Sequence, residues 1–327
     1  MTPIIPTIDN EETRHLDSAL RPSKFSDYIG QDTIKNNLHI LLTAARERNT
    51  PPEHILLYGP PGLGKTTLAH LIAKELNANL KLSSGPAIMK VGDLAAILTN
   101  LSPGDILFID EIHRLNKMIE EVLYPAMESG KLDIVIGKGP AARTIQLDLP
   151  PFTLIGATTR MSLLSSPLRS RFSGGVYRLQ YYTEDEIAQI VKNSAKVLGA
   201  ELPQDAAHEI AKRSRFTPRI ANYYLKRARD YAQVHKANID KEVVDTALSM
   251  LEIDEFGIGV SERMVLDALV NTFSGGPVGL NTLSAATGEE EDTIEDVTEP
   301  YLIQIGMLER TPRGRKATDK AIKYFKK

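Results

Sequence analysis

The segment GPPGLGKTT, from Gly59 to Thr67, has the spacing G-x-x-x-x-G-K-[ST] that is typical of a phosphate-binding loop. It follows a short apolar run at residues 54–58 and precedes a helical pattern at residues 66–76. A strand before the loop and a helix after it are the context that this motif requires. The sequence therefore predicts a site for the phosphates of a nucleotide.

The residue types in this loop have different chemical roles. Glycines let backbone N–H groups turn toward phosphate oxygens, and the N-terminus of the following helix adds a partial positive charge. The lysine brings a full positive charge to the β- and γ-phosphates, and the first threonine hydroxyl can bind Mg²⁺. The predicted nucleotide ligands of the loop are Gly59, Gly62, Gly64, Lys65, Thr66 and Thr67.

A second apolar run, DILFIDE at residues 105–111, places two carboxylates where its strand should end. Asp110 can hold Mg²⁺ through water, and Glu111 can orient and deprotonate a water molecule that attacks phosphate. Paired acids at a strand end also occur in solvated loops, but the upstream phosphate loop favours the catalytic interpretation. A carboxylate that activates water indicates hydrolysis of a nucleoside triphosphate.

A third apolar run, at residues 152–158, ends in the polar sequence GATTR. A hydroxyl there can reach between Glu111 and the γ-phosphate and position the attacking water. We predict this role for Thr159, with Thr158 as the alternative. The alternative is a purely structural role, in which both threonines only cap the loop after the strand.

Three arginines follow at positions that suit a charged transition state. Arg169 and Arg171 lie in SSPLRSRF, and an arginine supplied by a neighbouring subunit can stabilise charge on a phosphoryl group. We predict this finger role for Arg171, the alternative for both side chains being a salt bridge within the chain. Arg219, in TPRIAN, is predicted to report the nucleotide state, unless it is only a surface arginine.

The elements that must position these residues predict an α/β fold with a parallel sheet. The apolar runs are continuous, as in strands buried on both faces, and helical patterns lie between them. From Thr183 onward the pattern becomes purely helical, opening with a capping box of Thr183 and Glu186. Beyond residue 254 the order is helix, helix-turn-helix and hairpin, which is typical of a winged helix.

We therefore expect three domains. They are a large ATPase domain at residues 1–182 with a β-hairpin at about 131–149, a small helical lid at 183–253, and a winged-helix domain at 254–327. The hairpin is indicated by alternating apolar residues on both sides of a Gly-Lys-Gly-Pro turn.

Composition excludes several classes of protein. The chain of 327 residues has no Cys and no Trp, so disulfides, thiol nucleophiles and Cys-ligated metals are absent. We find no targeting signal and no apolar stretch of the length that a membrane span needs, and we expect a cytoplasmic protein. The net charge of −3 hides an acidic stretch at 281–300 and a basic one at 309–327, which is either a solvated face or a phosphate-contacting patch.

The chain resembles the AAA+ ATPases in the order of five elements and in having a helical lid. The five elements are the phosphate loop, the acid pair, GATTR, SSPLRSRF and TPRIAN. Within the AAA+ ATPases the chain resembles, over nearly its whole length, the bacterial RuvB family of Holliday-junction branch-migration ATPases. The hairpin and tail are specific to this family. The resemblance rests on the runs RPSKFSDYIGQ, GPPGLGKTTLA, LFIDEIHRLN, EEVLYPAMESGKLDIVIGKGPAAR, DLPPFTLIGATTR, SPLRSRF, TPRIAN, GGPVGL and TIEDVTEPYLIQIGMLERTPRGR.

The resemblance implies a homohexameric ring that encircles duplex DNA without sequence specificity and uses ATP and Mg²⁺. The family acts with RuvA at the junction, and with the resolvase RuvC in a larger complex, in recombination and DNA repair. It implies further nucleotide contacts on the adenine side, at the lid junction and near the subunit interface. These are Leu20, Arg21, Tyr28, Ile29, Tyr182 and Glu128.

The resemblance also implies contacts for both macromolecular partners. Ile134 and Ile136 in the hairpin are candidates for an exposed anchor on RuvA, although this apolar face could simply pack on its own domain. Around the turn of the wing, Arg310 and Arg315 are implied DNA contacts, and Arg313 flanks the same turn. Glu291 stands where an arginine is expected, so one DNA contact of the family is missing.

Three rival functions fit the sequence less well. A clamp-loader-like switch would usually place its finger in a Ser-Arg-Cys context, whereas Arg171 is followed by Phe172. A protein-remodelling ATPase should carry an aromatic pore loop, and SSGPAIMKVGDL has no aromatic residue. A transcription factor that only binds ATP would give Glu111 no purpose.

Overall fold

We describe residues 19–136 and 143–326 in a computed structural model of the chain. The chain divides into two compact units, which are described separately below. One unit contains the described residues up to Glu186 together with Thr217–Arg219, and the other contains Ile187–Phe216 and the chain from Ile220 onward. Across these described ranges, no helix combines the length and the apolarity that crossing a membrane would require.

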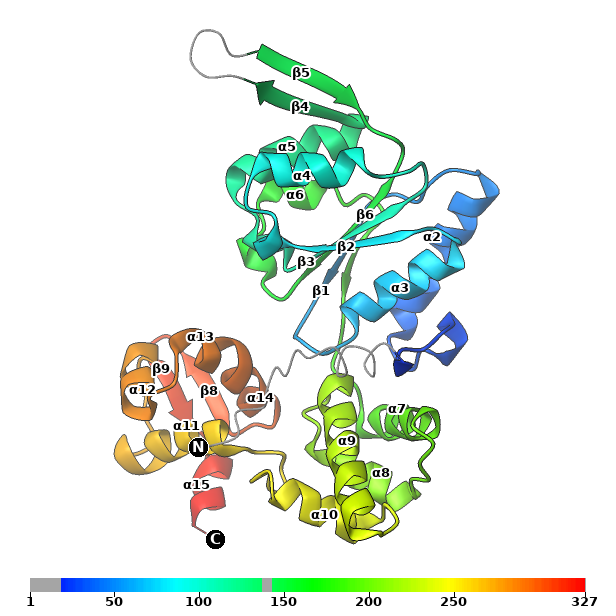
Figure 1. Cartoon of the computed structure of the whole chain (residues 1–327). Coiled ribbons are helices and arrows are strands. Elements are labelled where there is room, and N and C mark those ends of the chain that lie inside the picture. Colours follow the sequence, from blue (N-terminus) through cyan, green and yellow to red (C-terminus); the bar gives the residue numbers. More distant parts are fainter. Residues whose placement is uncertain (1–18, 137–142, 327) are drawn as a thin grey trace. The chain divides into compact units, whose positions relative to one another are not determined.

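A five-stranded parallel sheet forms the centre of the first unit (Figure 1). The strands run in the order β2-β3-β6-β1-β7, so β6 pairs with both β1 and β3. Leu57 is opposite Ala157, and Phe108 is opposite Ile155. The strands are β1 (Ile55–Tyr58), β2 (Leu80–Ser84), β3 (Ile106–Asp110), β6 (Thr153–Thr158) and β7 (Val176–Arg178).

Helices cover both faces of this sheet, which explains the continuous apolar runs. On one face Leu107, Ile109 and Leu154 join a core cluster with side chains from α4, α5 and α6. On the other face lies α3, which an ion pair between Arg46 and Glu75 at 3.6 Å links to α2. These helices are α2 (Asp32–Glu47), α3 (Lys65–Glu75), α4 (Val91–Thr99), α5 (Lys117–Ser129) and α6 (Ser166–Ser170); short 3-10 turns η1 (Phe25–Asp27) and η3 (Ile112–Arg114) lie between them.

The predicted fold class is confirmed, and the three predicted strands differ from the apolar runs by one residue at the N-terminal end. Among the elements of this unit that were not predicted are α2 and β7. The first is amphipathic, with Ile34, Leu38 and Leu42 buried at helical spacing. The second is only three residues long, and its ends are exposed.

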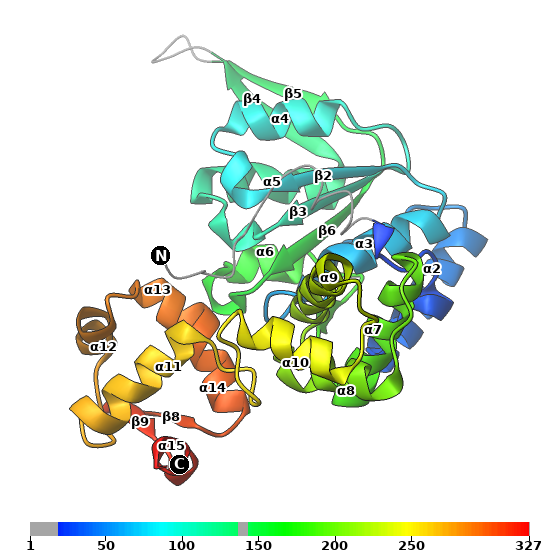
Figure 2. The same ribbon diagram turned by 60° about the horizontal axis from the view of Figure 1, so that its bottom comes forward.

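The predicted hairpin is present as β4 (Lys131–Ile136) and β5 (Arg143–Asp148), an antiparallel pair that extends away from the sheet (Figures 1 and 2). Ile134 is opposite Ile145. The Ile134 side chain packs partly against the core cluster, whereas Ile145 is 44% exposed. The Gly-Lys-Gly-Pro turn lies outside the described residues.

The second unit begins with helices only. They are α7 (Glu184–Val197, which starts in the first unit), α8 (Gln204–Arg213), α9 (Pro218–His235) and α10 (Lys241–Ser249). The predicted capping box at the start of α7 is confirmed, since the Thr183 N–H donates to Glu186 Oε2 at 2.7 Å and the Glu186 N–H donates to Thr183 Oγ1 at 3.2 Å.

The C-terminal part of this unit has the predicted winged-helix order. Its helices α11 (Val260–Asp267), α12 (Leu280–Thr287), α13 (Glu291–Thr293), α14 (Glu299–Gln304) and α15 (Asp319–Phe325) surround the hairpin of β8 (Leu308–Thr311) and β9 (Gly314–Ala317). Gly288 ends α12 in the left-handed conformation. A π-helical segment at Ile294–Thr298 joins α13 to α14.

A buried ion pair joins the lid helices to the winged helix. Arg215 donates two hydrogen bonds to Glu262 of α11, at 2.6 and 2.9 Å, and its guanidinium lies 5.2 Å from the centroid of the Tyr301 ring. Arg215 and Phe216 both adopt a positive φ, 56° and 57°. These two residues directly precede Thr217, where the TPRIAN segment begins.

Candidate functional site

The candidate site lies where three neighbouring strands end. Because β6 lies between β3 and β1, the carboxyl ends of the strands bring together the loop after Tyr58, the acid Asp110 and the hydroxyl of Thr158. Parallel α/β sheets bind ligands at this edge. The sheet order thus makes one site from segments far apart in the sequence.

The phosphate loop needs its glycines for steric reasons. Gly59, Gly62 and Gly64 have φ values of 144°, 80° and 98°, which residues with a side chain rarely adopt. A Cβ on Gly59 would lie 2.8 Å from the Leu179 carbonyl oxygen, and one on Gly64 would lie 2.9 Å from the Tyr28 hydroxyl. The loop is therefore a cradle of backbone with no room for further side chains.

Two tyrosines support this loop from behind. Tyr182 donates hydrogen bonds to the Tyr28 hydroxyl at 3.0 Å and to the Leu63 carbonyl at 3.2 Å, and both rings are buried. Burial raises the pKa of both phenols, so they remain donors at neutral pH. Two residues that the family resemblance assigns to nucleotide contact thus also hold the shape of the loop.

Lys65 is buried at the start of α3. Its Nζ donates to the carbonyl oxygens of Gly59 and Pro60, at 2.8 and 3.0 Å. Burial lowers the Lys65 pKa, and the nearby carboxylates of Asp110 and Glu111 oppose this shift. The ammonium group is therefore held over the cradle by weak acceptors that phosphate oxygens can replace.

The acid pair lies at the end of β3, with Asp110 as its last residue and Glu111 directly after it. The Glu111 N–H donates to Asp110 Oδ1 at 3.0 Å, and Glu111 itself has a φ of 46°. Burial raises the Asp110 pKa, and the charges of Lys65 and Arg219 oppose this rise. The two carboxylates thus have fixed and different directions at the end of the strand.

The two threonines after β6 have different partners. Thr159 Oγ1 donates to Glu111 Oε2 at 3.1 Å, which is the pairing that we expected for a water-positioning residue. Thr158 is fully buried, lies 2.9 Å from His113 Nδ1 and accepts a hydrogen bond from the Arg160 N–H at 3.0 Å. The geometry favours Thr159 over Thr158, and its role in positioning water stays a prediction.

Arg219 belongs to the same compact unit as the phosphate loop. A Cβ on Gly62 would lie 3.3 Å from the Arg219 Cβ, and the charge of Arg219 acts on the pKa values of both Lys65 and Asp110. The side chain is exposed. This placement suits a residue that senses the nucleotide, a role that stays a prediction.

Arg171, the predicted finger, contacts residues that lie outside the phosphate loop. One guanidinium nitrogen lies 3.1 Å from Glu128 Oε1, and another donates to the Pro167 carbonyl at 2.7 Å. The pair with Glu128 is the salt bridge that we named as the alternative. It brings together two residues that we assigned to a subunit interface, and Arg169 is exposed nearby.

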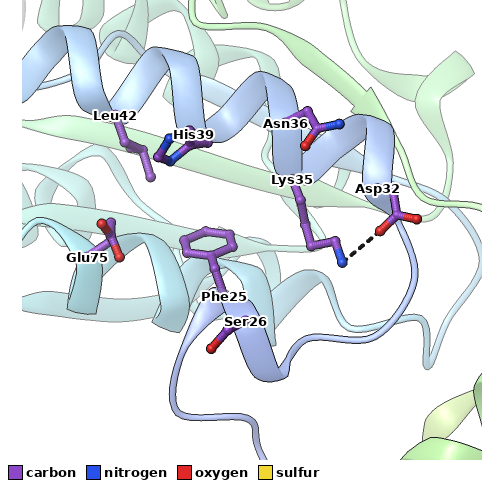
Figure 3. Close-up of a pocket in the computed structure, with 8 residues that line it drawn as sticks. All are labelled: Phe25, Ser26, Asp32, Lys35, Asn36, His39, Leu42 and Glu75. Carbon is purple, nitrogen blue, oxygen red and sulfur yellow. Dashed lines mark ion pairs between the residues drawn. The ribbon is translucent and has the colours of Figure 1, made fainter.

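On the adenine side, Leu20, Arg21 and Ile29 are half-buried, and an Arg21 guanidinium nitrogen lies 2.7 Å from His70 Nε2. A pocket of about 520 Å³ borders this segment (Figure 3). Its walls contain none of the predicted nucleotide ligands. It is lined by Phe25, Ser26, Asp32, Lys35, Asn36, His39, Leu42 and Glu75.

The wing arginines are not all free to meet DNA. Arg315 is buried and ion-paired with Glu299, which is itself buried. Arg310 is 49% exposed and pairs with Glu295. Arg313, at the tip of the hairpin, is exposed. DNA contact by Arg315, which we predicted from its place beside the turn, thus requires that Glu299 release it.

The remaining predicted residues are distributed over both units. Thr66 and Thr67 are half-buried in the first turn of α3, and Glu291 is exposed at the start of α13. The Ile136 backbone pairs with Arg143 in the hairpin, but its side chain lies outside the described structure. No sequence pattern singled out His113, whose Nδ1 lies 3.2 Å from Glu111 Oε2.

The site fits ATP with Mg²⁺. Among the described residues, no three His, Asp or Glu side chains cluster as a metal cage. Mg²⁺ at phosphate sites usually takes only one or two protein oxygens and completes its shell with phosphate and water. Thr66 and Asp110 can supply those oxygens beside the glycine cradle.

A phosphate loop after β1, an acid pair after β3, a hydroxyl after β6 and a helical lid define an AAA+ ATPase. Three family profiles match the chain in order: the P-loop domain of the Holliday junction DNA helicase RuvB at residues 20–179, the RuvB AAA lid at 182–254 and the RuvB C-terminal winged helix at 255–326. The chain belongs to the RuvB family.

Solved structures agree with this assignment. The chain is 49% identical to the RuvB Holliday junction branch migration motor of Thermotoga maritima, over 94% of this chain and 98% of that one, with a TM-score of 0.85. Two point-mutant structures of the same protein match with the same identity and coverage and TM-scores of 0.86. The chain is therefore an ATP-hydrolysing member of the branch-migration motors.

Proposed function

We propose that the chain assembles into a homohexameric ring that pulls duplex DNA and, together with RuvA, moves Holliday junctions. The observation that carries the proposal is the combination, in one chain, of a complete hydrolytic site, a projecting β-hairpin and a winged helix. Family membership supports work with RuvC in a larger complex and a place in the bacterial cytoplasm. We divide the chain into an ATPase domain, a lid and a winged helix at residues 1–182, 183–253 and 254–327, a division that the three family profiles support.

Each residue of the site has a part in hydrolysis. Lys65 and the loop N–H groups bind the phosphates and neutralise their charge. Thr66 and, through water, Asp110 would hold Mg²⁺, which when bound would supply further positive charge to the phosphate oxygens. Glu111 accepts the proton of the attacking water, and Thr159 fixes that water and the carboxylate relative to each other.

To move DNA, the ATP site must transmit a change in the bound nucleotide to the lid and the winged helix. Arg219 contacts the loop region while the helix that it opens, α9, lies in the other compact unit. A change of charge at the γ-phosphate therefore acts on a residue that belongs to the lid by sequence. We propose that this link moves the lid and the winged helix attached to it through Arg215 and Glu262.

The partners are assigned to separate surfaces. Ile134 and Ile136 of the hairpin form the proposed contact with RuvA, and the exposed Ile145 on the opposite strand supports it. Arg310, Arg313 and Arg315 form the proposed contact with DNA phosphates, independently of sequence.

The deciding experiment is dissociation of a synthetic four-way junction by the protein with Mg-ATP, with and without cognate RuvA. We expect dissociation only with ATP and RuvA together. ATP hydrolysis without dissociation in the presence of RuvA would contradict the proposal and would favour a switch or a loader of another protein.

The Lys65→Ala variant should bind ATP at least about 100-fold more weakly, because a charge-assisted contact to phosphate is lost. Lys65 is buried at a cost to its charged form, so the variant should keep its Tm. Titration with a fluorescent ATP analogue and thermal unfolding measure the two effects. Wild-type affinity would remove Lys65 from the site.

The wing arginines should separate into two classes. Arg313→Glu should weaken DNA binding and reduce the slope of log K against log[salt] by about 1 to 2, with no change in Tm. Arg315→Ala should instead lower stability by about 1.5 to 3 kcal/mol, because the buried Glu299 carboxylate loses its hydrogen-bonded cation and keeps only the longer ion pair with Arg310, at 3.6 Å. Salt titrations and thermal unfolding distinguish them. An unchanged Tm for Arg315→Ala would show that this pair is not structural.

A further inference from the structure

We propose that Tyr124 is a positioning residue that, with Glu120 and Ser165, holds Arg171 ready to act on the ATP of the neighbouring subunit. We call Tyr124, Glu120 and Ser165 the finger platform. This inference rests on the finger role proposed for Arg171, and it names the residues that prepare that role.

The platform is built on one face of α5. Glu120, Tyr124 and Glu128 are spaced four residues apart, and side chains at this spacing lie one above another on a helix. This face is turned toward α6, as the contacts of Tyr124 and Glu120 with Ser165 show. The short helix α6 ends at Ser170, and Arg171 follows it as the C-cap.

The Tyr124 ring is the surface on which the guanidinium rests. Arg171 Cζ lies 4.4 Å from the centroid of the Tyr124 ring, a stacking distance at which the ring attracts the cation. This contact holds the guanidinium against the ring, and its nitrogens bond to other acceptors. The Pro167 carbonyl is one of these acceptors, and Glu128 is another.

Hydrogen bonds beneath the ring fix its position. The Tyr124 hydroxyl donates to Glu120 Oε2 at 3.0 Å and lies 2.9 Å from Ser165 Oγ, and Ser165 Oγ donates to Glu120 Oε2 at 2.6 Å. Glu120 is 5% exposed. A buried carboxylate with two hydroxyl donors is held in one geometry. Burial also raises the Tyr124 pKa, so the phenol keeps its proton.

The same network extends to the helix that carries the finger. Ser165 is the N-cap of α6, and its Oγ accepts from the Leu168 N–H at 3.3 Å. The Tyr124 ring and the backbone before Arg171 therefore share one anchor. This shared network fixes the position of the guanidinium relative to both α5 and α6.

Glu128, the ion-pair partner of Arg171, can be replaced by another anion at small cost. The Glu128 side chain is 61% exposed, whereas that of Arg171 is 19% exposed. A partly exposed ion pair contributes little to stability, so a phosphate oxygen can replace Glu128 at small cost. The Arg171 Nε is buried without a hydrogen-bond partner. The nitrogen that pairs with Glu128 is therefore the one that a phosphate can reach, while the Tyr124 ring keeps its contact with the guanidinium.

The first test compares Tyr124→Leu with Tyr124→Phe. Loss of the ring should lower kcat for ATP about 10- to 100-fold with KM unchanged, because ATP binds to the subunit's own loop while the finger acts on a neighbour. Tyr124→Phe keeps the ring but loses the hydroxyl that Glu120 and Ser165 hold, so it should recover only part of the rate. Tyr177→Phe removes a hydroxyl that donates to the Gly174 carbonyl and serves as the matched control with wild-type turnover.

The second test uses rings of mixed subunits. Tyr124→Leu subunits keep an intact ATP site, so mixing them with Glu111→Gln subunits, which keep an intact finger, should restore activity at some interfaces. Mixing Tyr124→Leu with Arg171→Ala should restore nothing, because both lack the same function. A variant that merely unfolds the domain would fail in both mixtures.

The outcomes distinguish a failure of the platform from a failure of the finger role proposed for Arg171. Wild-type kcat for Tyr124→Leu, or no recovery when it is mixed with Glu111→Gln while Arg171→Ala does recover, would overturn the platform alone. No recovery for Arg171→Ala mixed with Glu111→Gln would overturn the finger across subunits and the platform with it.

Discussion

Arg171→Ala should bind ATP normally and hydrolyse it at least about 1,000-fold more slowly than the wild type, since this is the usual contribution of an arginine finger. Arg171 makes its contacts with Glu128, the Pro167 carbonyl and the Tyr124 ring, and none of these belongs to the phosphate loop. We therefore expect the finger to act outside the phosphate site of its own subunit. Nucleotide binding and single-turnover hydrolysis, measured separately, test this expectation.

The control for Arg171→Ala is Arg169→Ala. Arg169 lies two residues earlier in α6 and is exposed, so its loss should leave turnover nearly unchanged. Equal loss in both variants would point to damage in α6. Loss of ATP affinity in Arg171→Ala would instead place the side chain at the site of its own subunit.

Glu111→Gln should bind ATP and turn it over about 100- to 10,000-fold more slowly, the range for loss of a general base. The amide has the shape of the carboxylate and keeps an oxygen that can accept from Thr159, so the loop should keep its conformation. Only the capacity to take a proton from water is removed. Steady-state phosphate release, with ATP binding measured in parallel, gives the result.

Glu121→Gln makes the same chemical change on an exposed position of α5 and should leave the rate unaltered. Normal turnover in Glu111→Gln would remove Glu111 from water activation. The base would then have to be sought among the neighbours of Asp110.

Strands buried on both faces were the easiest part of the fold to predict. The runs that became β3 and β6 are apolar at every interior position, because helices cover both sides of the sheet. By contrast, β7 is a three-residue edge strand with exposed ends and has no apolar run. The helix α2 did carry a signal in the helical spacing of Ile34, Leu38 and Leu42.

The site was predictable as a set of residues, but not as a set of contacts. The motif spacing indicated Lys65, Glu111 and Thr159, yet their meeting depends on β6 lying between β1 and β3, which no local pattern encodes. The pairing of Arg315 with Glu299 also depends on packing, because nothing in the sequence distinguishes Arg315 from the other arginines of the wing. Tyr124 looks like a core residue of an amphipathic helix.

The place of β6 in the sheet has a consequence for synthesis on the ribosome. Strands β1 and β3 leave the ribosome first, and the strand that joins them follows only after α5 and the whole hairpin. Until Thr153–Thr158 has emerged, the phosphate loop and the acid pair belong to separate pieces of sheet with unpaired edges, which are prone to aggregate. The nascent chain thus joins the two parts of its nucleotide site only when β6 emerges, and the other edge of β1 is paired later still, by β7.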